Sequence, residues 1–192
     1  MLKSFSDLGI NKQLEQDLVN LKISIPTDIQ EQTIPVLLNE KEDMVVLAKT
    51  GTGKTAAFGL PLLQLIDLEN INVQSLILAP TRELAQQIYT NLVSFAGSSS
   101  KIAITSLCGG IPIKPQIEKL KATTHIAVAT PGRLVDLIKR EAIALNKIKY
   151  LVLDEADEMV SSLKKDLDFI IKDLPKSKRT LLFTATMPGT IK

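Results

Sequence analysis

From residue 44 onward, short continuous apolar runs alternate with longer stretches in which apolar residues recur every third or fourth position. Continuous short runs are typical of strands buried on both faces, and the longer period is that of amphipathic helices. The pattern predicts strands at residues 44–47, 75–79, 101–107, 125–129, 150–154 and 179–183. It predicts helices at about 54–66, 82–96, 112–120, 131–139 and 158–173.

This alternation of strands and helices predicts an α/β fold with a mainly parallel, doubly wound sheet and right-handed crossovers. Ligands of such folds bind at the carboxyl ends of the strands. Residues 1–40 lie outside the alternation and look helical. Asn11 and Thr27 are suited to begin two helices there, and Pro35 predicts a kink or break in the second one.

The segment after the first predicted strand combines glycines with a Lys-Thr pair that opens a helix, which is typical of a phosphate-binding loop. The general pattern has glycine where Ala48 stands, so an ordinary Gly/Thr-rich turn is the alternative. Lys54 is expected to bridge the β- and γ-phosphates, and the Thr55 hydroxyl to hold a magnesium ion. The nucleotide-binding residues expected here are Thr50, Gly51, Thr52, Gly53, Lys54 and Thr55.

A second acidic site follows the predicted strand at 150–154, where Asp154 and Glu155 stand side by side. Carboxylates at a strand tip need a positive or hydrogen-bonding partner. We expect Asp154 to engage a magnesium ion, partly through water, and Glu155 to orient or deprotonate the attacking water. The alternative is a surface turn with acidic residues at a helix start. The expected catalytic residues are therefore Lys54, Asp154 and Glu155.

The composition limits the classes of protein to which the chain can belong. The 192 residues suit one domain with a sizeable core, and the apolar runs are too short to span a membrane. One cysteine and one histidine exclude an internal disulfide and a zinc site, and favour a reducing, cytoplasmic location. The net charge is +2, so contacts to nucleic acid must come from local donors.

The sequence Asp154-Glu155-Ala156-Asp157, together with residues 48–55, resembles the DEAD-box RNA helicase family, in which alanine at the position of Ala48 is normal. Five further segments match motifs of that family in the expected order. They are Pro26–Gln30, with Phe5 upstream (the Q motif), Pro80–Ala85 (motif Ia), Gly109-Gly110, Thr130–Arg133 (motif Ib) and Thr184–Thr186 (motif III).

The resemblance implies a three-layer RecA-like fold that binds ATP and Mg²⁺. Residues 1–40 would form a helical Q-motif segment packed on the lobe, and residues 41–192 the first RecA-like domain. Gln30 would contact the adenine edge, and Phe5 would stack on the base. The alternatives are a helix-surface amide for Gln30 and a hydrophobic anchor of the N-terminal helix for Phe5.

The resemblance also implies contacts to the sugar–phosphate backbone of RNA with little sequence preference. The residues concerned are Pro80, Thr81, Arg82, Gly109, Gly110, Thr130, Pro131, Gly132 and Arg133. Helix capping by the threonines and a surface ion pair for Arg82 are the alternatives. Asp157, Thr184 and Thr186 would couple the nucleotide state to RNA binding, unless the threonine hydroxyls satisfy their own backbone.

The chain departs from the family pattern at three places. Thr184 stands where serine is usual, Lys22-Ile23 replaces a glycine–aromatic pair, and Leu163-Lys164 lies where a Gly-Phe pair is common. The family's second RecA-like lobe, which carries arginine fingers, is not in this chain. We therefore expect a monomeric lobe of a two-lobe helicase that binds adenine nucleotide but barely hydrolyses it by itself. A nucleotide-gated adaptor and a DNA-directed helicase or other P-loop ATPase are the competing hypotheses.

Overall fold

The protein is described here by a computed structural model that places residues 3–97 and 100–186, so the end of the predicted domain 41–192 lies outside the described residues. The described strands form a six-stranded sheet in the order β1-β6-β5-β2-β4-β3, and every pairing in it is parallel. The predicted α/β class is therefore confirmed. The strands are β1 (Met44–Leu47), β2 (Ser75–Leu78), β3 (Ile104–Leu107), β4 (Ile126–Ala129), β5 (Tyr150–Asp154) and β6 (Arg179–Thr184).

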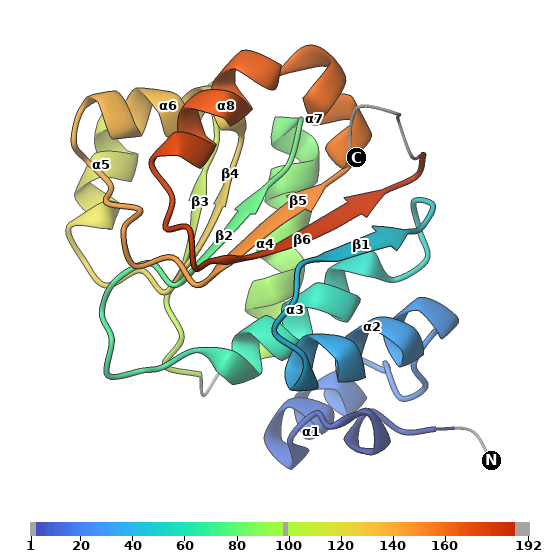
Figure 1. The fold of residues 1–192 in the computed structure, drawn as a ribbon. Coiled ribbons are helices and arrows are strands. Elements are labelled where there is room, and N and C mark those ends of the chain that lie inside the picture. The colour runs from blue at the N-terminus through green and yellow to red at the C-terminus, as the bar shows by residue number, and fades with distance from the viewer. Residues whose placement is uncertain (1–2, 98–99, 187–192) are drawn as a thin grey trace.

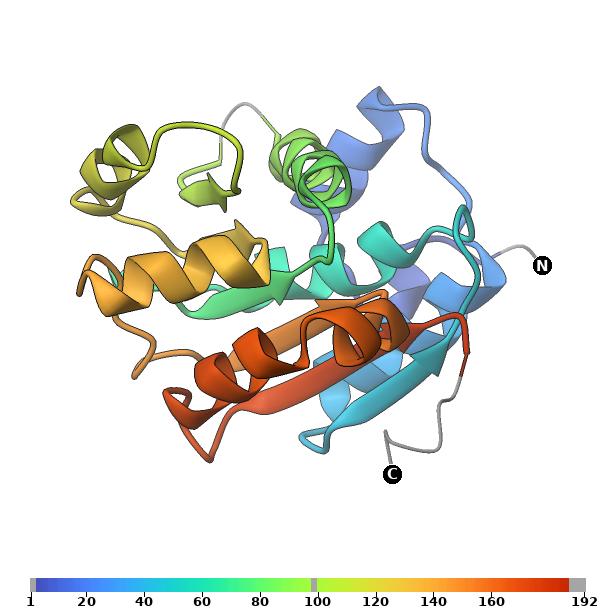
Figure 2. The same cartoon turned by 90° about the horizontal axis from the view of Figure 1, so that it is seen from above.

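Helices cover both faces of this sheet and complete three layers (Figures 1 and 2). One face packs against α1 (Lys12–Asn20), α2 (Asp28–Asn39), α3 (Lys54–Leu65) and α4 (Arg82–Ala96). The other face packs against α6 (Pro131–Lys139), α7 (Ala156–Ser162) and α8 (Lys164–Lys172). The short helix α5 (Lys114–Leu120) lies beside the edge strand β3, and a 3₁₀ turn, η1 (Ser6–Leu8), precedes α1.

Strand residues alternate between the two apolar layers, which explains why the strands read as continuous apolar runs. On β2, Ile77 packs with the α3 side, whereas Leu76 and Leu78 pack with the α6 side. The strands β2, β4 and β5 are buried along nearly their whole length. Parallel strands buried on both faces need no polar positions, so these three strands show no alternation of apolar and polar residues.

The N-terminal segment shares the core of the first layer. Asn11 begins α1 by accepting a hydrogen bond from the Leu14 amide at 2.9 Å, as predicted. The carboxyl end of α2 is held by the buried guanidinium of Arg179 on β6, whose Nη1 donates to the Leu37 and Glu40 carbonyls at 2.8 Å each. This interaction ties α2, whose first turn holds the end of the Q motif, to the sheet.

Three expectations about the elements were wrong in detail. The helix predicted at 158–173 is two helices, α7 and α8, divided at Leu163 (φ −123°, ψ 21°). Ser161 and Ser162 both donate their hydroxyl groups to the Glu158 carbonyl, and such bonds compete with the helical ladder. Of the kink or break expected at Pro35, the break does not occur: α2 runs unbroken from Asp28 to Asn39. The strand expected from residue 101 begins at Ile104.

The carboxyl ends of the strands meet along one edge. Leu47 at the end of β1 lies opposite Thr184 on β6, and Asp154 at the end of β5 lies opposite Phe183. The residues that follow these strands are therefore neighbours in space. Within the described ranges, no helix combines the length and apolar character that crossing a bilayer requires.

Candidate functional site: a nucleotide cleft and an RNA-facing edge

The loop between β1 and α3 turns sharply at two glycines with positive φ, 79° at Gly51 and 92° at Gly53. A Cβ atom at Gly53 would lie 2.4 Å from Nε2 of Gln30, so both the backbone angle and the neighbouring side chain require glycine there. The helix α3 begins at Lys54, directly after this turn. The first N–H groups of a helix have no partner within the helix, so those at the start of α3 suit an anion site.

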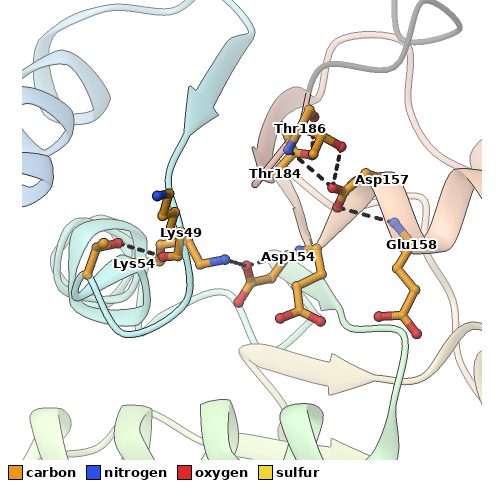
Figure 3. Close-up of polar contacts among 9 residues, drawn as sticks. Lys49, Lys54, Asp154, Asp157, Glu158, Thr184 and Thr186 are labelled. Carbon is orange, nitrogen blue, oxygen red and sulfur yellow. Dashed lines mark hydrogen bonds and ion pairs between the residues drawn. The ribbon is translucent and has the colours of Figure 1, made fainter.

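Lys54 and Asp154 form a buried ion pair beside this loop (Figure 3). Lys54 Nζ lies 3.2 Å from Asp154 Oδ1, and the two side chains are 7% and 2% exposed. The Nζ atom nevertheless makes no hydrogen bond of good geometry among the described residues. Burial raises the pKa of Asp154 above its ordinary value, and the Lys54 charge partly opposes this rise. The pair thus leaves Lys54 with N–H groups available to a phosphate oxygen.

Glu155 follows Asp154 in the left-handed conformation (φ 55°, ψ 51°), which sends the chain directly into α7. Its carboxylate is half-buried. Burial and the adjacent Asp154 charge raise the pKa of Glu155 above its ordinary value. A carboxylate with a raised pKa accepts a proton more readily, as a general base requires.

A cleft of about 460 Å³ opens beside the phosphate loop. One wall holds Gly51, Gly53, Lys54 and Thr55, and Asp154 and Glu155 lie in the same cleft. A second hollow of about 400 Å³ shares Thr50, Lys54 and Glu155 with it. The structure therefore brings the predicted phosphate loop and acidic pair together, although about 100 residues separate them in the chain.

The cleft is also lined by residues that sequence reasoning missed. They are Ile23, Leu84, Gln87, Asn91 and Phe95. Four of them lie on α4, whose apolar period indicated only core packing, and no local motif marks the amides of Gln87 and Asn91. Ile23 belongs to the pair that departs from the family pattern, which was the one available signal.

Gln30 is buried, and both ends of its amide are engaged. Its Oε1 accepts from the Thr27 amide at 2.9 Å, and its Nε2 donates to the Gly53 carbonyl at 3.1 Å. Thr27 also donates its hydroxyl to the Thr52 carbonyl at 2.9 Å. In this structure Gln30 therefore joins α2 to the phosphate loop, and an adenine would have to exchange with one of these bonds.

The base-stacking role expected of Phe5 is corrected by the structure. The Phe5 ring is 1% exposed and belongs to the core that α1, α2 and α3 share. Neither face of the ring is open to a base, because residues of this core cover the ring. The structure supports the alternative of a hydrophobic anchor.

The three expected coupling residues form one cluster beside the acidic pair (Figure 3). Asp157 Oδ2 accepts from the Thr186 hydroxyl at 2.7 Å and from the Thr186 amide at 3.2 Å. The Thr184 hydroxyl donates to the Thr186 carbonyl at 2.6 Å. Thr184 therefore makes a hydrogen bond to the backbone, as the alternative stated for it predicts. These hydroxyl bonds hold the pKa of Asp157 below its ordinary value although burial opposes them.

The expected RNA-contacting residues gather at the carboxyl ends of β2, β3 and β4. Arg82 Nη1 approaches the Gly110 carbonyl at 3.4 Å, and Arg133 Nη2 donates to the Ile111 carbonyl at 2.8 Å. Thr81 caps α4 by accepting from the Leu84 amide at 3.2 Å. Pro80 precedes Thr81 at the end of β2, and Thr130, Pro131 and Gly132 start α6 beside Arg133.

A magnesium ion would find few protein ligands here. No group of three or more His, Cys, Asp or Glu residues within 3–97 and 100–186 is arranged to hold a metal. Thr55 and Asp154 lie in one cleft, which fits an ion that takes its remaining ligands from a nucleotide and water.

Comparison with known proteins identifies the class. The sequence model of the DEAD/DEAH box helicase family matches residues 27–192, and the chain belongs to this family. The DEAD-box ATP-dependent RNA helicase CshA of Streptococcus pneumoniae is 47% identical over 189 residues, which cover 98% of this chain. The ATP-dependent RNA helicase CshA of Listeria monocytogenes is 42% identical over the whole chain.

Solved structures agree. A DEAD box protein from the hyperthermophile Methanococcus jannaschii superposes with a TM-score of 0.92 at 41% identity, covering 98% of this chain and 51% of that one. A variant of Saccharomyces cerevisiae Dbp5 bound to RNA and ADP BeF3 gives 0.88 at 34% identity, with coverage of 98% and 48%. The chain spans 36% of the length of the CshA proteins.

Proposed function

We propose that this chain is the ATP-binding and RNA-backbone-binding N-terminal lobe of a DEAD-box RNA helicase. The observation that carries the proposal is the buried Lys54 at the start of the helix that follows the phosphate loop. Lys54 is paired with Asp154 at 3.2 Å and still lacks a hydrogen-bond partner among the described residues. A triphosphate supplies the oxygens that such a lysine and helix start lack.

In the proposed complex the N–H groups of residues 50–55 and the Lys54 ammonium bind the phosphates. Thr55 and Asp154 would hold Mg²⁺, which would neutralise charge on the phosphate oxygens. Glu155, whose pKa is raised, orients the attacking water and accepts its proton. Gln30 holds Gly53 in place and recognises the adenine. To contact the adenine, Gln30 would give up one of its two hydrogen bonds, to the Thr27 amide or to the Gly53 carbonyl.

Farther along the same edge of the sheet, Arg82 and Arg133 would donate to RNA phosphates, and the helix starts at Arg82 and Pro131 would add N–H groups. Contacts to phosphates fix the position of the strand and read no sequence. Asp157 lies on α7 three positions after Asp154, is bonded to Thr186 after β6, and would transmit the nucleotide state.

We further propose that the complete protein couples ATP hydrolysis to the remodelling or unwinding of RNA duplexes in the cytoplasm, with a second RecA-like lobe as partner. The lobe by itself would be a monomer with very slow hydrolysis. A transition-state arginine supplied by another lobe accounts for roughly 10³–10⁵ of the rate in related phosphoryl-transfer systems.

Calorimetric titration with Mg²⁺ and ATP, ADP or GTP tests the nucleotide site. We expect binding of the adenine nucleotides and loss of binding in Lys54→Ala. The matched control is Lys49→Ala, which removes the same charge from an exposed position of the same loop and should bind nearly as well as the wild type. No uptake of ATP at millimolar concentration would refute the proposal.

Competition between single-stranded RNA and DNA of the same length then separates an RNA-directed lobe from a DNA-directed one. Preference for DNA would favour the competing class. An adaptor without ATPase activity would not need the base Glu155, so its presence in the chain argues against the adaptor hypothesis. In the two-lobe protein, Glu155→Gln should abolish ATP hydrolysis while ATP binding persists.

A further inference from the structure

The turn from Cys108 to Ile111, here called the glycine turn, is held by side chains at each of its residues. The Cys108 carbonyl accepts from Gln116, and the Gly109 amide donates to the Thr130 hydroxyl at 3.4 Å. The Gly110 and Ile111 carbonyls accept from the two arginines described above. The four side chains come from α5, from the residue before α6, and from α4 and α6.

Gln116 makes the innermost of these contacts. Its side chain is 3% exposed, and its Nε2 donates to the Cys108 carbonyl at 2.9 Å. Its Oε1 is buried and has no hydrogen-bond partner among the described residues. A buried amide with one unsatisfied oxygen is costly to the fold. The bond to Cys108 is the specific interaction that this amide makes.

The glycine turn needs such an external support. Gly110 has φ +77°, and a Cβ there would lie 2.6 Å from Arg82 Nη1. Two consecutive glycines leave the free chain many conformations, so the position of the two carbonyls facing the arginines is not set by the backbone itself. Side-chain bonds from the surrounding helices must select one of these conformations.

We propose that Gln116 is a positioning residue for RNA binding: its amide fixes the glycine turn, and the turn holds the guanidinium groups of Arg82 and Arg133 ready for phosphates. This inference rests on the proposed RNA-binding function. The Arg82 contact at 3.4 Å is long, so a phosphate oxygen can replace it at little cost. Arg133 keeps one buried Nη1 without a partner among the described residues.

Gln116 carries no charge, and this separates its role from that of the arginines. The salt dependence of binding counts the phosphates that a protein neutralises. Loss of an arginine contact lowers both the affinity and the slope of log K against log [salt], by about one unit for each contact. Loss of a positioning amide lowers the affinity and leaves the slope unchanged.

The test uses Gln116→Met, which keeps the length of the side chain and removes the donor. The matched control is Gln74→Met at the other end of the sheet. Gln74 is also buried, 1% exposed, and its Nε2 donates to the Asp67 and Asn70 carbonyls. Both variants lose a buried amide that holds a loop, so a general loss of stability affects both.

Binding of a labelled oligouridylate to the full chain is measured by fluorescence anisotropy at several salt concentrations. We expect Gln116→Met to bind about tenfold more weakly with the slope of the wild type, and Gln74→Met to bind as the wild type does. Arg82→Met should bind more weakly with a smaller slope. Gly110→Ala displaces Arg82 by a second route, and its effect should not add to that of Gln116→Met, since both act through one turn.

Hydrogen exchange of the Gly109 amide without RNA provides a readout that does not depend on binding. Exchange should be faster in Gln116→Met and unchanged in Gln74→Met. Three results would overturn the inference while the proposed function stands. They are an RNA affinity of Gln116→Met equal to that of the wild type, a reduced salt slope in this variant, and additive effects of Gln116→Met and Gly110→Ala on RNA affinity. A wild-type chain that binds no RNA would overturn both.

Discussion

Removing Lys54 leaves the Asp154 carboxylate buried without its counter-charge. The two side chains are 7% and 2% exposed, with their charged atoms 3.2 Å apart. Breaking one side of a buried pair costs about 3–5 kcal/mol. We expect the lower end, about 3 kcal/mol, for Lys54→Met, because the adjacent cleft admits water. In a domain of this size that loss corresponds to a fall of about 6–12 °C in melting temperature.

The double variant Lys54→Met/Asp154→Asn removes both charges and should recover most of the lost free energy of unfolding, since a neutral pair suffers no charge burial. The free energy of unfolding of the wild type, the single variant and the double variant is measured by urea unfolding. Far-ultraviolet circular dichroism follows the transition, because the chain contains no tryptophan whose fluorescence could be used. Lys49→Met, at an exposed position, should leave stability unchanged. The single and double variants should both lose nucleotide binding, so stability and function separate in the double variant.

The pH dependence gives an independent check with a definite sign. Burial raises the pKa of Asp154, and Lys54 opposes this rise, so Lys54→Met raises the Asp154 pKa further. A carboxyl whose folded pKa exceeds its unfolded value near 3.9 binds its proton more tightly in the folded state. Stability then falls as the pH rises from the unfolded pKa through the folded pKa. The deficit of Lys54→Met should therefore be smaller at pH 5 than at pH 8. An equal deficit at both pH values, or a double variant as unstable as the single one, would refute the reasoning.

Three further predictions concern the scaffold. Lys22, two residues after the end of α1, has φ 61°, a left-handed conformation that suits glycine, so Lys22→Gly should raise the free energy of unfolding by about 0.5–1 kcal/mol. Lys121→Gly, directly after α5 with φ −71°, should lower the free energy of unfolding, and urea unfolding of both variants compares the two signs. Arg179→Met leaves the carbonyls at the end of α2 without their buried donor and should cost about 3 kcal/mol, seen as a lower urea midpoint with unchanged slope. Gly110→Ala should weaken RNA binding about tenfold. Gly109→Ala, where a Cβ would meet no protein atom within 4 Å, should leave Arg82 in place and weaken binding less in the same anisotropy assay.

The fold class was predictable because it follows from local periodicity. Parallel strands covered on both faces require continuous apolar runs, and amphipathic helices require a period near 3.6, and both can be counted along the chain. The phosphate loop and the acidic pair were predictable for the same reason. Their chemistry depends on short segments whose backbone conformation is set nearby, as the helix start at Lys54 shows.

The break between α7 and α8 was missed because the apolar period continues across Leu163 while the serine hydroxyls interrupt the ladder. The sequence could not decide between the two roles stated for Phe5, and it gave no sign that both ends of the Gln30 amide are engaged, for another reason. Each depends on which distant segment packs against the residue, and the same side chain in a different packing would be free to meet a base.

The sequence by itself thus determined the order of the elements, the edge of the sheet where ligands bind, and the residues able to hold a phosphate. Tertiary structure decided how far their charges are shielded, which amides are already engaged, and which unmarked residues support the site. Arg179 reaches carbonyls more than 130 positions away, and Gln116 holds a turn that precedes its own helix. Burial and hydrogen-bond geometry are properties of neighbours in space, and those neighbours are set only when the layers close around the sheet.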